Sequence, residues 1–320
     1  MYLLKKVKEN VIGIADVIKS QGLRKAIRVF IFNVIFNIVP PPSKEEVIKS
    51  EIGLKISILP HDRGISRELK IFKVHEPLTT KTLIKELIRL KKLLRKVTVV
   101  DIGSNIGYYA ILEAKILGEN GTVICIEPVR RNFQALLKNI ELNNVDNAEA
   151  IKVALSDKRG LAKMIVASGS NWARLLDDKD YSAPQTENVR VTTLDNIFSN
   201  NRKIDLIRMD VEGHEYRVIK GGLHIIKKHL PSFLIEVHPN LLGKHELQNL
   251  LSIFRDLGYT IKILIYRNTD VPLAAFDKDI VTNIDFSSLI MHSPNWPFTL
   301  FIEHPNKIRH GQPNENRHSW

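Results

Sequence analysis

The sequence is poor in cysteine and in long apolar runs. Cys125 is the only cysteine, so an internal disulfide is excluded, and no Cys/His cluster has the spacing of a structural zinc site. The apolar stretch Val29–Val39 is interrupted by Asn33 and Asn37, and it falls short of the roughly 20 residues that span a bilayer. The basic start has no small-residue cleavage site before Pro40, which argues against a secretory signal. We therefore expect a cytoplasmic protein, with peripheral contact at the inner membrane face left open.

The composition is that of an ordinary water-soluble globular chain. Its 320 residues are 44% hydrophobic, 7% aromatic and 26% charged, which excludes wholesale disorder, a collagen repeat and a coiled coil. A single core stops growing at about 250 to 300 residues, so the length favours a main domain with an appendage.

Positive charge is concentrated in the first third of the chain. Residues 1–100 hold 21 Lys and Arg against 9 Asp and Glu, whereas residues 101–320 hold 26 of each, so the net charge of +12 belongs to the first hundred. Such a segment attracts an anionic partner, for example membrane headgroups, nucleic acid or a phosphorylated substrate. A solvated basic surface is the alternative.

The chain is predicted to have four parts, of which the first, 1–42, is a basic and apolar helical accessory segment. The prolines at 40–42 end its helix, because the residue before a proline is pushed out of the helical region. Two interpretations fit this helix. Arg24, Lys25 and Arg28 suit an amphipathic helix lying in the plane of a membrane. We favour the other, a helix whose apolar side packs on the main domain.

The other parts are a lead-in at 43–96, a core domain at 97–305 and a flexible polar tail at 306–320. The lead-in shows strand-like stretches at 53–60 and 69–74, followed by helical spacing over 79–96. Short apolar strands and helices then alternate, which predicts an α/β fold, a Rossmann-like, seven-stranded and mostly parallel sheet with helices on both faces. The expected strands are 97–100, 122–126, 150–155, 204–209, 232–237, 259–265 and 297–303.

The sharpest local signal follows the first of these strands, in the sequence VVDIGSNIGYY. Asp101 ends the strand, and Gly103, Asn105 and Gly107 form a turn before a helix. Open α/β sheets bind ligands at this end of their strands, so a cofactor is expected here. Glycine lets the backbone approach closely, and asparagine tolerates the left-handed conformation. The spacing differs from G-x-G-x-x-G, which serves a pyrophosphate.

Acidic and polar residues also end the next two strands. Glu127 comes twenty residues after Gly107, where a carboxylate accepts hydrogen bonds from both hydroxyls of a ribose. Ser156 and Asp157 follow the third strand and are placed to meet an adenine edge, although Asp157 alone also fits a plain turn. Together these strand ends suit an adenosine with a cationic tail that carries no phosphate.

These residues resemble the class I S-adenosylmethionine-dependent methyltransferases, and within them the FkbM family. The resemblance runs from about residue 52 to 239 and rests on the order of VVDIGSNIGYYA, VICIEP, VALSDKRG, VRVTTLDNIF, IDLIRMDVEGHEYRVIKGG and FLIEVHP. It implies S-adenosylmethionine as cofactor, with Asp101, Gly103, Asn105 and Gly107 at its methionine part. It also implies that Glu127 holds the ribose and that Ser156 and Asp157 hold the adenine. His75-Glu76-Pro77 resembles a family element beside the pocket, which makes Glu76 a ligand contact.

The catalytic groups are expected after the fourth and fifth strands. Transfer to a hydroxyl requires alignment with the methyl group and removal of the acceptor's proton. Asp210, Glu236 and His238 are suitable proton acceptors at that end of the sheet. Glu236 and His238 are two apart and so project from one face of a strand. We favour His238 or Asp210 as the base, with Glu236 orienting it or binding substrate; a plain strand-end histidine is the alternative for His238.

Other residues are expected to contact the acceptor or an ion. Glu212 is a candidate substrate ligand, and the insertion at 168–187 would overhang the cofactor side, bringing Trp172 and Arg174, unless it is an ordinary surface loop. A divalent metal held by a set of acids and histidines is a less favoured alternative, and no metal is assigned. The candidate ligands for that alternative are Asp210, Glu212, His214, Glu236 and His238.

The acceptor class comes from the family resemblance alone. It implies O-methylation of a hydroxyl on a sugar, a glycolipid or a secondary metabolite, so a small molecule, glycan or glycolipid is the expected partner. The absence of an Asn/Asp-Pro-Pro-aromatic sequence after the fourth strand disfavours base amines, and the strand position of Cys125 disfavours a nucleophilic role. An RNA methyltransferase, prompted by the basic first third, is the competing enzyme. A non-catalytic module that binds cofactor or glycolipid is a third hypothesis.

Overall fold

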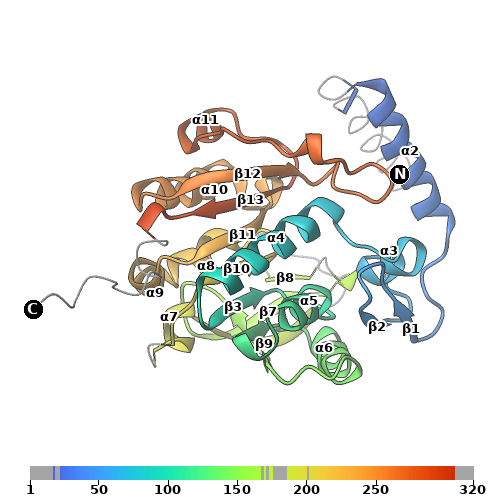
Figure 1. Ribbon diagram of the computed structural model, residues 1–320, viewed down its shortest axis with the longest axis horizontal. Helices are drawn as coiled ribbons and strands as arrows, with labels where there is room; N and C mark the ends of the chain where they lie inside the picture. Colours follow the sequence, from blue (N-terminus) through green and yellow to red (C-terminus); the bar gives the residue numbers. More distant parts are fainter. Residues whose placement is uncertain are drawn as a thin grey trace, which may run out of the picture.

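The computed structural model describes residues 17–18, 22–166, 169–170, 173–175, 186–199 and 202–306 (Figure 1). Among these residues, seven strands form the central sheet in the order β12-β13-β11-β10-β3-β4-β5. Their bounds are β3 Val97–Ile102, β4 Gly121–Ile126, β5 Ala148–Ile151, β10 Leu206–Met209, β11 Ser232–Val237, β12 Thr260–Tyr266 and β13 Phe298–Glu303. β13 pairs antiparallel with both β11 and β12, and the other pairs of this sheet are parallel. The predicted seven-stranded, mostly parallel sheet is confirmed.

The winding of the sheet reverses between β3 and β10. From β3 the chain adds β4 and β5 on one side, and it then returns to add β10 and β11 on the other. Ligands of open α/β sheets bind at the carboxyl ends of the strands at such a reversal. β3 and β10 pair in parallel, with Arg208 opposite Asp101 and Met209 opposite Ile102. The segments that follow both strands therefore meet at one edge.

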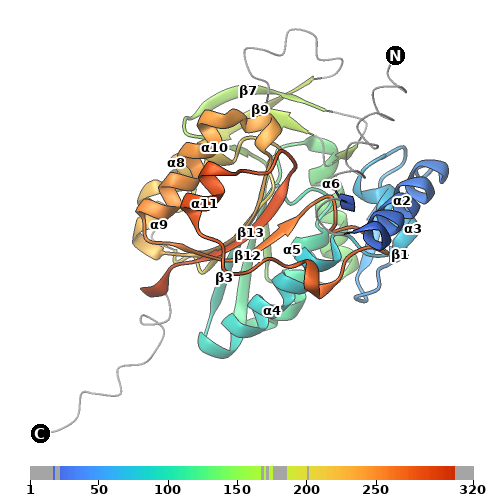
Figure 2. The same cartoon turned by 90° about the horizontal axis from the view of Figure 1, so that it is seen from above.

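Helices cover both faces of the sheet, because alternate strand residues point to opposite sides. Val99 and Val123 pack in one hydrophobic cluster with residues of three helices, α4 Pro77–Leu93, α5 Tyr108–Leu117 and α6 Arg130–Leu142. Val100 and Ile124 pack in another with α8 Glu215–Lys220, α9 Leu223–His229 and α10 Pro239–Asp256. Figure 2 shows the second set of helices apart from α4 and α5, with the sheet between them. Cys125 is fully buried in the first cluster, as expected of a small core residue.

A smaller sheet follows β5. Its strands are β6 Ala154–Leu155, β7 Gly160–Ile165, β8 Arg174–Leu175 and β9 Thr186–Thr192, in the order β6-β9-β7-β8. The predicted single strand over 150–155 is therefore wrong, because β5 stays in the central sheet and β6 pairs with β9 instead. Ser156 and Asp157 consequently follow a strand of the smaller sheet.

The lead-in packs against the core instead of standing apart from it. β1 Glu46–Lys49 and β2 Lys55–Ile58 form a hairpin, and Ile56 and Ile58 are fully buried in the α4–α5–α6 cluster. The prediction of a strand at 69–74 is wrong, because this sequence ends the helix α3 Ile65–Phe72. The carboxylate of Asp62 accepts the backbone N–H groups of Gly64 and Ser66 at 2.9 Å and so satisfies donors at the helix start.

Two glycines break the helix predicted over 218–228 into α8 and α9. A Cβ on Gly221 would lie 2.0 Å from the carbonyl oxygen of Ser156, and one on Gly222 would lie 2.6 Å from the Leu194 side chain. The close approach to the 154–157 segment thus requires glycine at the break. The remaining elements are α7 Leu194–Ile197, α11 Phe286–Met291 and two short 3-10 turns, η1 Gly118–Asn120 and η3 Asp277–Asp279.

The helix α2 Leu23–Ile38 lies beside α3 and the segment before η3 (Figures 1 and 2). Ala26, Val29 and Phe32 are buried, and the Phe32 ring stacks on Phe72 at a centroid distance of 5.1 Å. The favoured interpretation, packing on the main domain, is confirmed for this face of the helix. Within the described residues, no helix has both the length and the apolar character to cross a membrane. The tail from residue 307 onward lies outside those residues, and the four-part division stays a prediction.

Candidate active site

The turn after β3 brings its backbone against the segment that follows β10. Gly103, Asn105 and Gly107 all have left-handed backbone conformations, with φ of +80°, +51° and +91°. The expectation that asparagine supports such a conformation is confirmed. A Cβ on Gly103 would lie 1.9 Å from the carbonyl oxygen of Asp210, so a side chain here would push the two strand ends apart.

Glu127 ends β4 and faces this turn. Its Oε2 accepts the backbone N–H of Asn105 and its Oε1 accepts that of Val129, both at 2.9 Å. The carboxyl is buried, and burial raises its pKa to about 7 even though the two N–H groups favour the charged form. Each oxygen keeps a further lone pair, so the group can still accept hydrogen bonds from a ligand.

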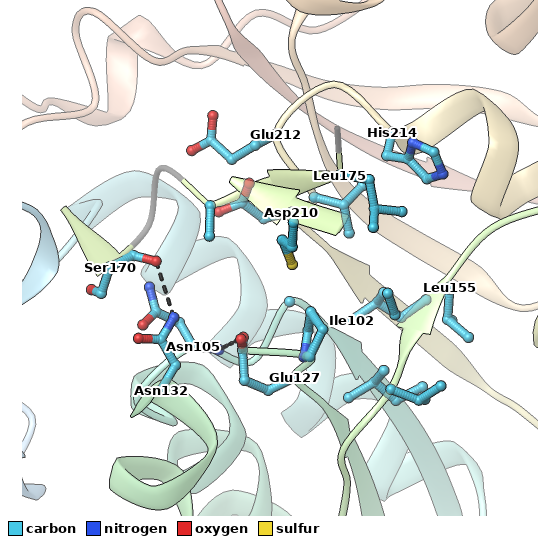
Figure 3. A pocket seen from close by; sticks show the side chains of 18 residues that line it. Ile102, Asn105, Glu127, Asn132, Leu155, Ser170, Leu175, Asp210, Glu212 and His214 are labelled. Atoms are coloured by element: carbon cyan, nitrogen blue, oxygen red, sulfur yellow. Dashed lines mark hydrogen bonds between the residues drawn. The ribbon is translucent and has the colours of Figure 1, made fainter. Parts of the chain in front are cut away.

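A cavity opens between these segments (Figure 3), and its empty space, counted out to the open solvent, is about 580 Å³. In the view of Figure 3, Glu127 and Asn105 lie below Asp210 and Glu212, so carboxylates face the cavity from two sides. Apolar side chains make up most of the rest of the wall: Ile102, Ile126, Pro128, Val153, Ala154, Leu155, Met164, Ala173, Leu175 and Val211.

Beside the cavity, Asp210, Glu212, Glu236 and His238 form what we call the acid–histidine cluster. The Nε2 of His238 lies 3.4 Å from Glu212 Oε2, 3.8 Å from Glu236 Oε1 and 4.0 Å from Asp210 Oδ1. Asp210 and Glu212 also line the cavity. The three predicted catalytic residues are thus brought together, and the cluster shares a wall with the cavity.

Electrostatics divide the cluster into acids that resist ionisation and a histidine that favours its charged form. Burial raises the pKa of Asp210, and it raises that of Glu212 to about 8. Burial alone would lower the pKa of His238, but the hydrogen bond to Glu215 and the surrounding carboxylates hold it well above 6.5. A protonated His238 cannot accept a proton, and a carboxyl of the cluster can do so only in its ionised form.

A family model for the methyltransferase FkbM domain matches residues 101–261. The chain belongs to the FkbM methyltransferase family. The matched range covers the turn after β3, Glu127 and the whole acid–histidine cluster. The fold is therefore the Rossmann-like fold of class I methyltransferases, as the sequence resemblance implied. No curated protein matches the chain.

Solved structures share this fold at low sequence identity. Methyltransferase FkbM from Methylobacillus flagellatus KT is 14% identical over 76% of this chain and 67% of its own, with a TM-score of 0.41. P. horikoshii TYW2 in complex with MeSAdo is 18% identical over 82% and 71%, with a TM-score of 0.37. An rRNA methylase from Streptococcus thermophilus is 10% identical over 72% and 97%, with a TM-score of 0.39. At these TM-scores the structural similarities say nothing about the substrate of this chain.

Two residues of the turn after β3 contact other protein groups and do not line the cavity. The cavity lining, taken over the described residues, does not include Asp101 or Gly107. Asp101 is fully buried, and its Oδ1 accepts a hydrogen bond at 3.2 Å from Arg208 on the adjacent strand. A Cβ on Gly107 would lie 2.7 Å from Leu136, so this glycine serves the packing of α5 on α6. The ligand contacts that the resemblance implies for these two residues stay predictions.

The two residues predicted to hold the adenine also contact other protein groups. Ser156 Oγ lies 2.9 Å from His214 Nε2, and Asp157 Oδ2 accepts a hydrogen bond from Lys220 Nζ at 3.0 Å. Neither is in the described cavity lining, which takes residues 153–155 from this segment. The central strand β5 ends at Ile151, four residues before the predicted end at Leu155, and β6 pairs with β9 in the smaller sheet. The adenine contacts of Ser156 and Asp157 stay predictions.

Glu76 lies against the cluster instead of the cavity. It is buried with a left-handed φ of +41°, and its Oε2 accepts a hydrogen bond from the Tyr109 hydroxyl at 2.8 Å. Its Oε1 lies 3.1 Å from Arg267 Nε and 3.2 Å from His75 Nε2. Burial alone would lower the pKa of His75, but the carboxylates of Glu76 and Glu68 together raise it to about 10. In the structure Glu76 pairs with Arg267 and His75, and its contact with a cofactor stays a prediction.

The metal alternative reduces to three residues. One ligand atom each from Asp210, Glu236 and His238 lies within 4.8 Å of the others, a spacing that could hold a cation. His214 points instead to Ser156. Arg267 Nε lies 3.5 Å from Glu236 Oε1 and Arg208 lies 3.6 Å from Asp210 Oδ2, so guanidinium groups already offset the acids. The acid–base role of the cluster and the metal alternative both stay predictions.

The insertion overhangs the cavity where it is described. Ser170, Ala173 and Leu175 line the cavity, and the side-chain amide of Asn132 donates to the Ser170 carbonyl at 3.0 Å. Trp172 lies outside the described residues. Arg174 is in β8 between two lining residues and is half-buried, without lining the cavity itself. The general position of the insertion is as expected, and the substrate contacts of these two residues stay predictions.

Sequence reasoning missed three residues of the site. Arg208 is buried in β10 and counters Asp101, and a charged residue inside an apolar strand was a signal for it. Arg267 follows an edge strand and reaches Glu76 and Glu236, with no sequence pattern to mark it. Glu215 is fully buried and contacts His238, but it reads as an ordinary acid in the first turn of a helix.

Proposed function

We propose that the protein transfers a methyl group from S-adenosylmethionine to a hydroxyl of a glycan, a glycolipid or a related small metabolite. One observation carries this proposal: Asp210 and Glu212 line the cavity and also belong to the acid–histidine cluster. A hydroxyl at that shared wall would meet a proton acceptor and the cavity contents together.

The cavity suits the nucleoside end of this cofactor. The Glu127 carboxylate has free lone pairs for the ribose hydroxyls, and the Oδ1 of Asn105 is buried without a hydrogen-bond partner among the described residues. The apolar wall at Val153–Leu155, Met164 and Leu175 suits a flat base. When bound, S-adenosylmethionine supplies a methyl group on a sulfonium centre, whose positive charge is compatible with the acids Asp210 and Glu212.

Asp210 is the base in this proposal. Its Oδ1 is buried without a hydrogen-bond partner among the described residues and lies 4.0 Å from the Nε2 of His238. With S-adenosylmethionine bound as the methyl donor, Asp210 would accept the proton of the acceptor hydroxyl. His238, held by Glu215, stabilises the carboxylate, while Glu236 and Glu212 orient the acceptor hydroxyl.

The acceptor class is tested by supplying methyl-labelled cofactor with fractionated lipids, glycans and RNA from the host. We expect label in the glycan or glycolipid fraction. Label confined to RNA would replace the acceptor assignment, and no label in any fraction would favour a binding module without activity. An Asp210→Asn variant, which should bind cofactor but transfer poorly, separates enzymatic labelling from adventitious methylation.

A further inference from the structure

One side of α2 exposes a continuous apolar stripe. Leu23, Ile27, Phe30, Ile31, Val34 and Ile38 form it, and we call it the outer face of α2; their exposed fractions range from 37% at Val34 to 74% at Ile38. At 3.6 residues per turn these six fall within an arc of about 100°. The buried Ala26, Val29 and Phe32 occupy the opposite side. The helix is thus apolar on two sides, and only one is covered by the described residues.

Exposed apolar side chains are concentrated here. Sixteen large hydrophobic residues of the described chain are exposed, and six of them make up the outer face. Ile18 is a seventh from the N-terminal segment, and Leu273 and Phe276 come from the adjoining segment, where Arg28 donates to the Leu273 carbonyl at 3.4 Å. A soluble monomer scatters such residues singly, so a gathering of nine marks a contact surface.

The charge around this stripe is positive. The sequence of α2 contains no acid, and Arg24 and Arg28 are exposed along one edge of the outer face. The Arg28 guanidinium stacks over the Phe276 ring at 4.8 Å, and Lys278 lies 5.8 Å from the same ring. An apolar stripe bordered by arginine and lysine matches the boundary between acyl chains and anionic headgroups.

We propose that α2 lies in the plane of an anionic membrane and inserts its outer face below the headgroups. The helix is 16 residues long, about 24 Å, and its other side is fixed to Phe72 and the segment at 271–274, so it lies flat and does not span. The segment that meets α2 at Leu273 and Phe276 begins at Arg267, which pairs with Glu76 and Glu236. The membrane contact therefore adjoins the segment that supplies a cation to the acid–histidine cluster.

Sedimentation of the full chain with vesicles tests this proposal. One set of vesicles is phosphatidylcholine alone, and the other also contains about 30% phosphatidylglycerol, a fraction on the order of the anionic lipid content of cell membranes. We expect binding to anionic vesicles that weakens with salt and little binding to neutral ones. A Phe30→Gln/Val34→Gln variant should bind roughly tenfold more weakly or worse, because two inserted apolar side chains are lost. Leu161→Gln is the matched control, since Leu161 is 80% exposed on β7, away from α2.

The remaining outcomes also decide the question. Equal vesicle binding by wild type and Phe30→Gln/Val34→Gln, or no binding by wild type, overturns the proposal. A wild-type dimer in analytical ultracentrifugation that dissociates in this variant, without vesicle binding, assigns the face to a second copy. Ile38→Gln at the last turn of the helix provides an independent variant, and thermal melting of each protein establishes that folding is intact. The inference does not depend on the acceptor, because vesicle binding is measured without cofactor.

Discussion

The imidazole of His238 is fixed by the carboxylate of Glu215. The Nδ1 of His238 lies 2.7 Å from Oε1 of Glu215, and the same oxygen accepts the backbone N–H of Gly213 at 3.0 Å. This hydrogen bond turns Nε2 toward the three carboxylates of the acid–histidine cluster. Because Glu215 is fully buried, its charge acts on the ring with little screening by water.

Replacing Glu215 with glutamine should slow turnover and leave cofactor binding intact. Glutamine keeps an Oε1 for His238 and Gly213 but removes the negative charge, so the pKa of His238 falls and its charged form becomes less favoured. We expect a lower kcat, with a loss that grows as the pH rises past the lowered pKa of His238, and a cofactor Kd unchanged within about threefold. Steady-state kinetics and calorimetry measure both quantities. A normal kcat over the whole pH range would show that the charge of Glu215 has no role.

Asp210→Asn should abolish most of the transfer. Asparagine keeps the shape of the side chain but cannot take up the acceptor's proton, and loss of a general base costs about 10²- to 10⁴-fold in rate. Asp157→Asn is the comparison, because Asp157 pairs with Lys220 outside the described cavity lining. It should keep wild-type kcat and cofactor affinity. If the Asp157 variant lost cofactor binding, the adenine contact expected from the sequence would be restored.

Cofactor affinity should fall below about pH 7. The pKa of Glu127 is raised to about 7 by burial, so in the empty protein its carboxyl is neutral below that pH and charged above it. Ribose hydroxyls donate to the charged form, so binding lowers this pKa and releases protons, and affinity weakens by up to about tenfold for each pH unit below 7.

The Glu127→Gln variant supplies the control for this pH dependence. It should bind roughly 1 to 3 kcal/mol more weakly at pH 8, because the charged acceptor is lost. Its affinity should depend less on pH than that of the wild type between about pH 5.5 and 8, a range chosen to bracket a pKa near 7, because Glu212 still titrates at the cavity. Glu141→Gln, on the exposed side of α6, should behave as wild type. A wild-type affinity independent of pH would remove Glu127 from the ribose site.

The sequence predicts the framework of the site because the strands of the central sheet are short, apolar and separated by helices. Glu127 at the end of β4 and Asp210 after β10 follow from that pattern alone, since parallel strands bring their carboxyl ends to one edge. The left-handed Asn105 also follows from its residue type.

Contacts between segments that are distant in the sequence could not be predicted from local sequence patterns. Nothing local shows that Asp101 turns to Arg208, because the pairing depends on the register of β3 against β10. The departure of β6 into the smaller sheet is likewise a tertiary choice, and it moves Ser156 to His214. Propensity also misjudged 69–74, where capping by Asp62 favours a helix over a strand.

Removal of divalent cations should leave the activity unchanged. Arg267 and Arg208 lie within 3.6 Å of Glu236 and Asp210, so the acids have counter-charges within the protein. The check is the transfer rate after dialysis against EDTA, with and without added Mg²⁺ or Mn²⁺. Stimulation by either ion that is lost in Glu236→Gln would instead make Asp210, Glu236 and His238 metal ligands.

Comparing alanine variants of Gly103 and Gly53 distinguishes backbone strain from steric crowding in the turn after β3. Both have left-handed φ, +80° and +83°, but a Cβ at Gly53 meets nothing within 4 Å, whereas one at Gly103 lies 1.9 Å from the Asp210 carbonyl oxygen. Gly53→Ala should therefore cost about 1 to 2 kcal/mol of unfolding free energy, the strain of the conformation. Gly103→Ala should cost more and should also weaken cofactor binding, since the strand ends must move apart. Urea unfolding and calorimetry on the two variants measure these effects. Equal losses of stability, with cofactor affinity preserved in both, would show that the β3 and β10 ends tolerate separation and that their close approach does not shape the cavity.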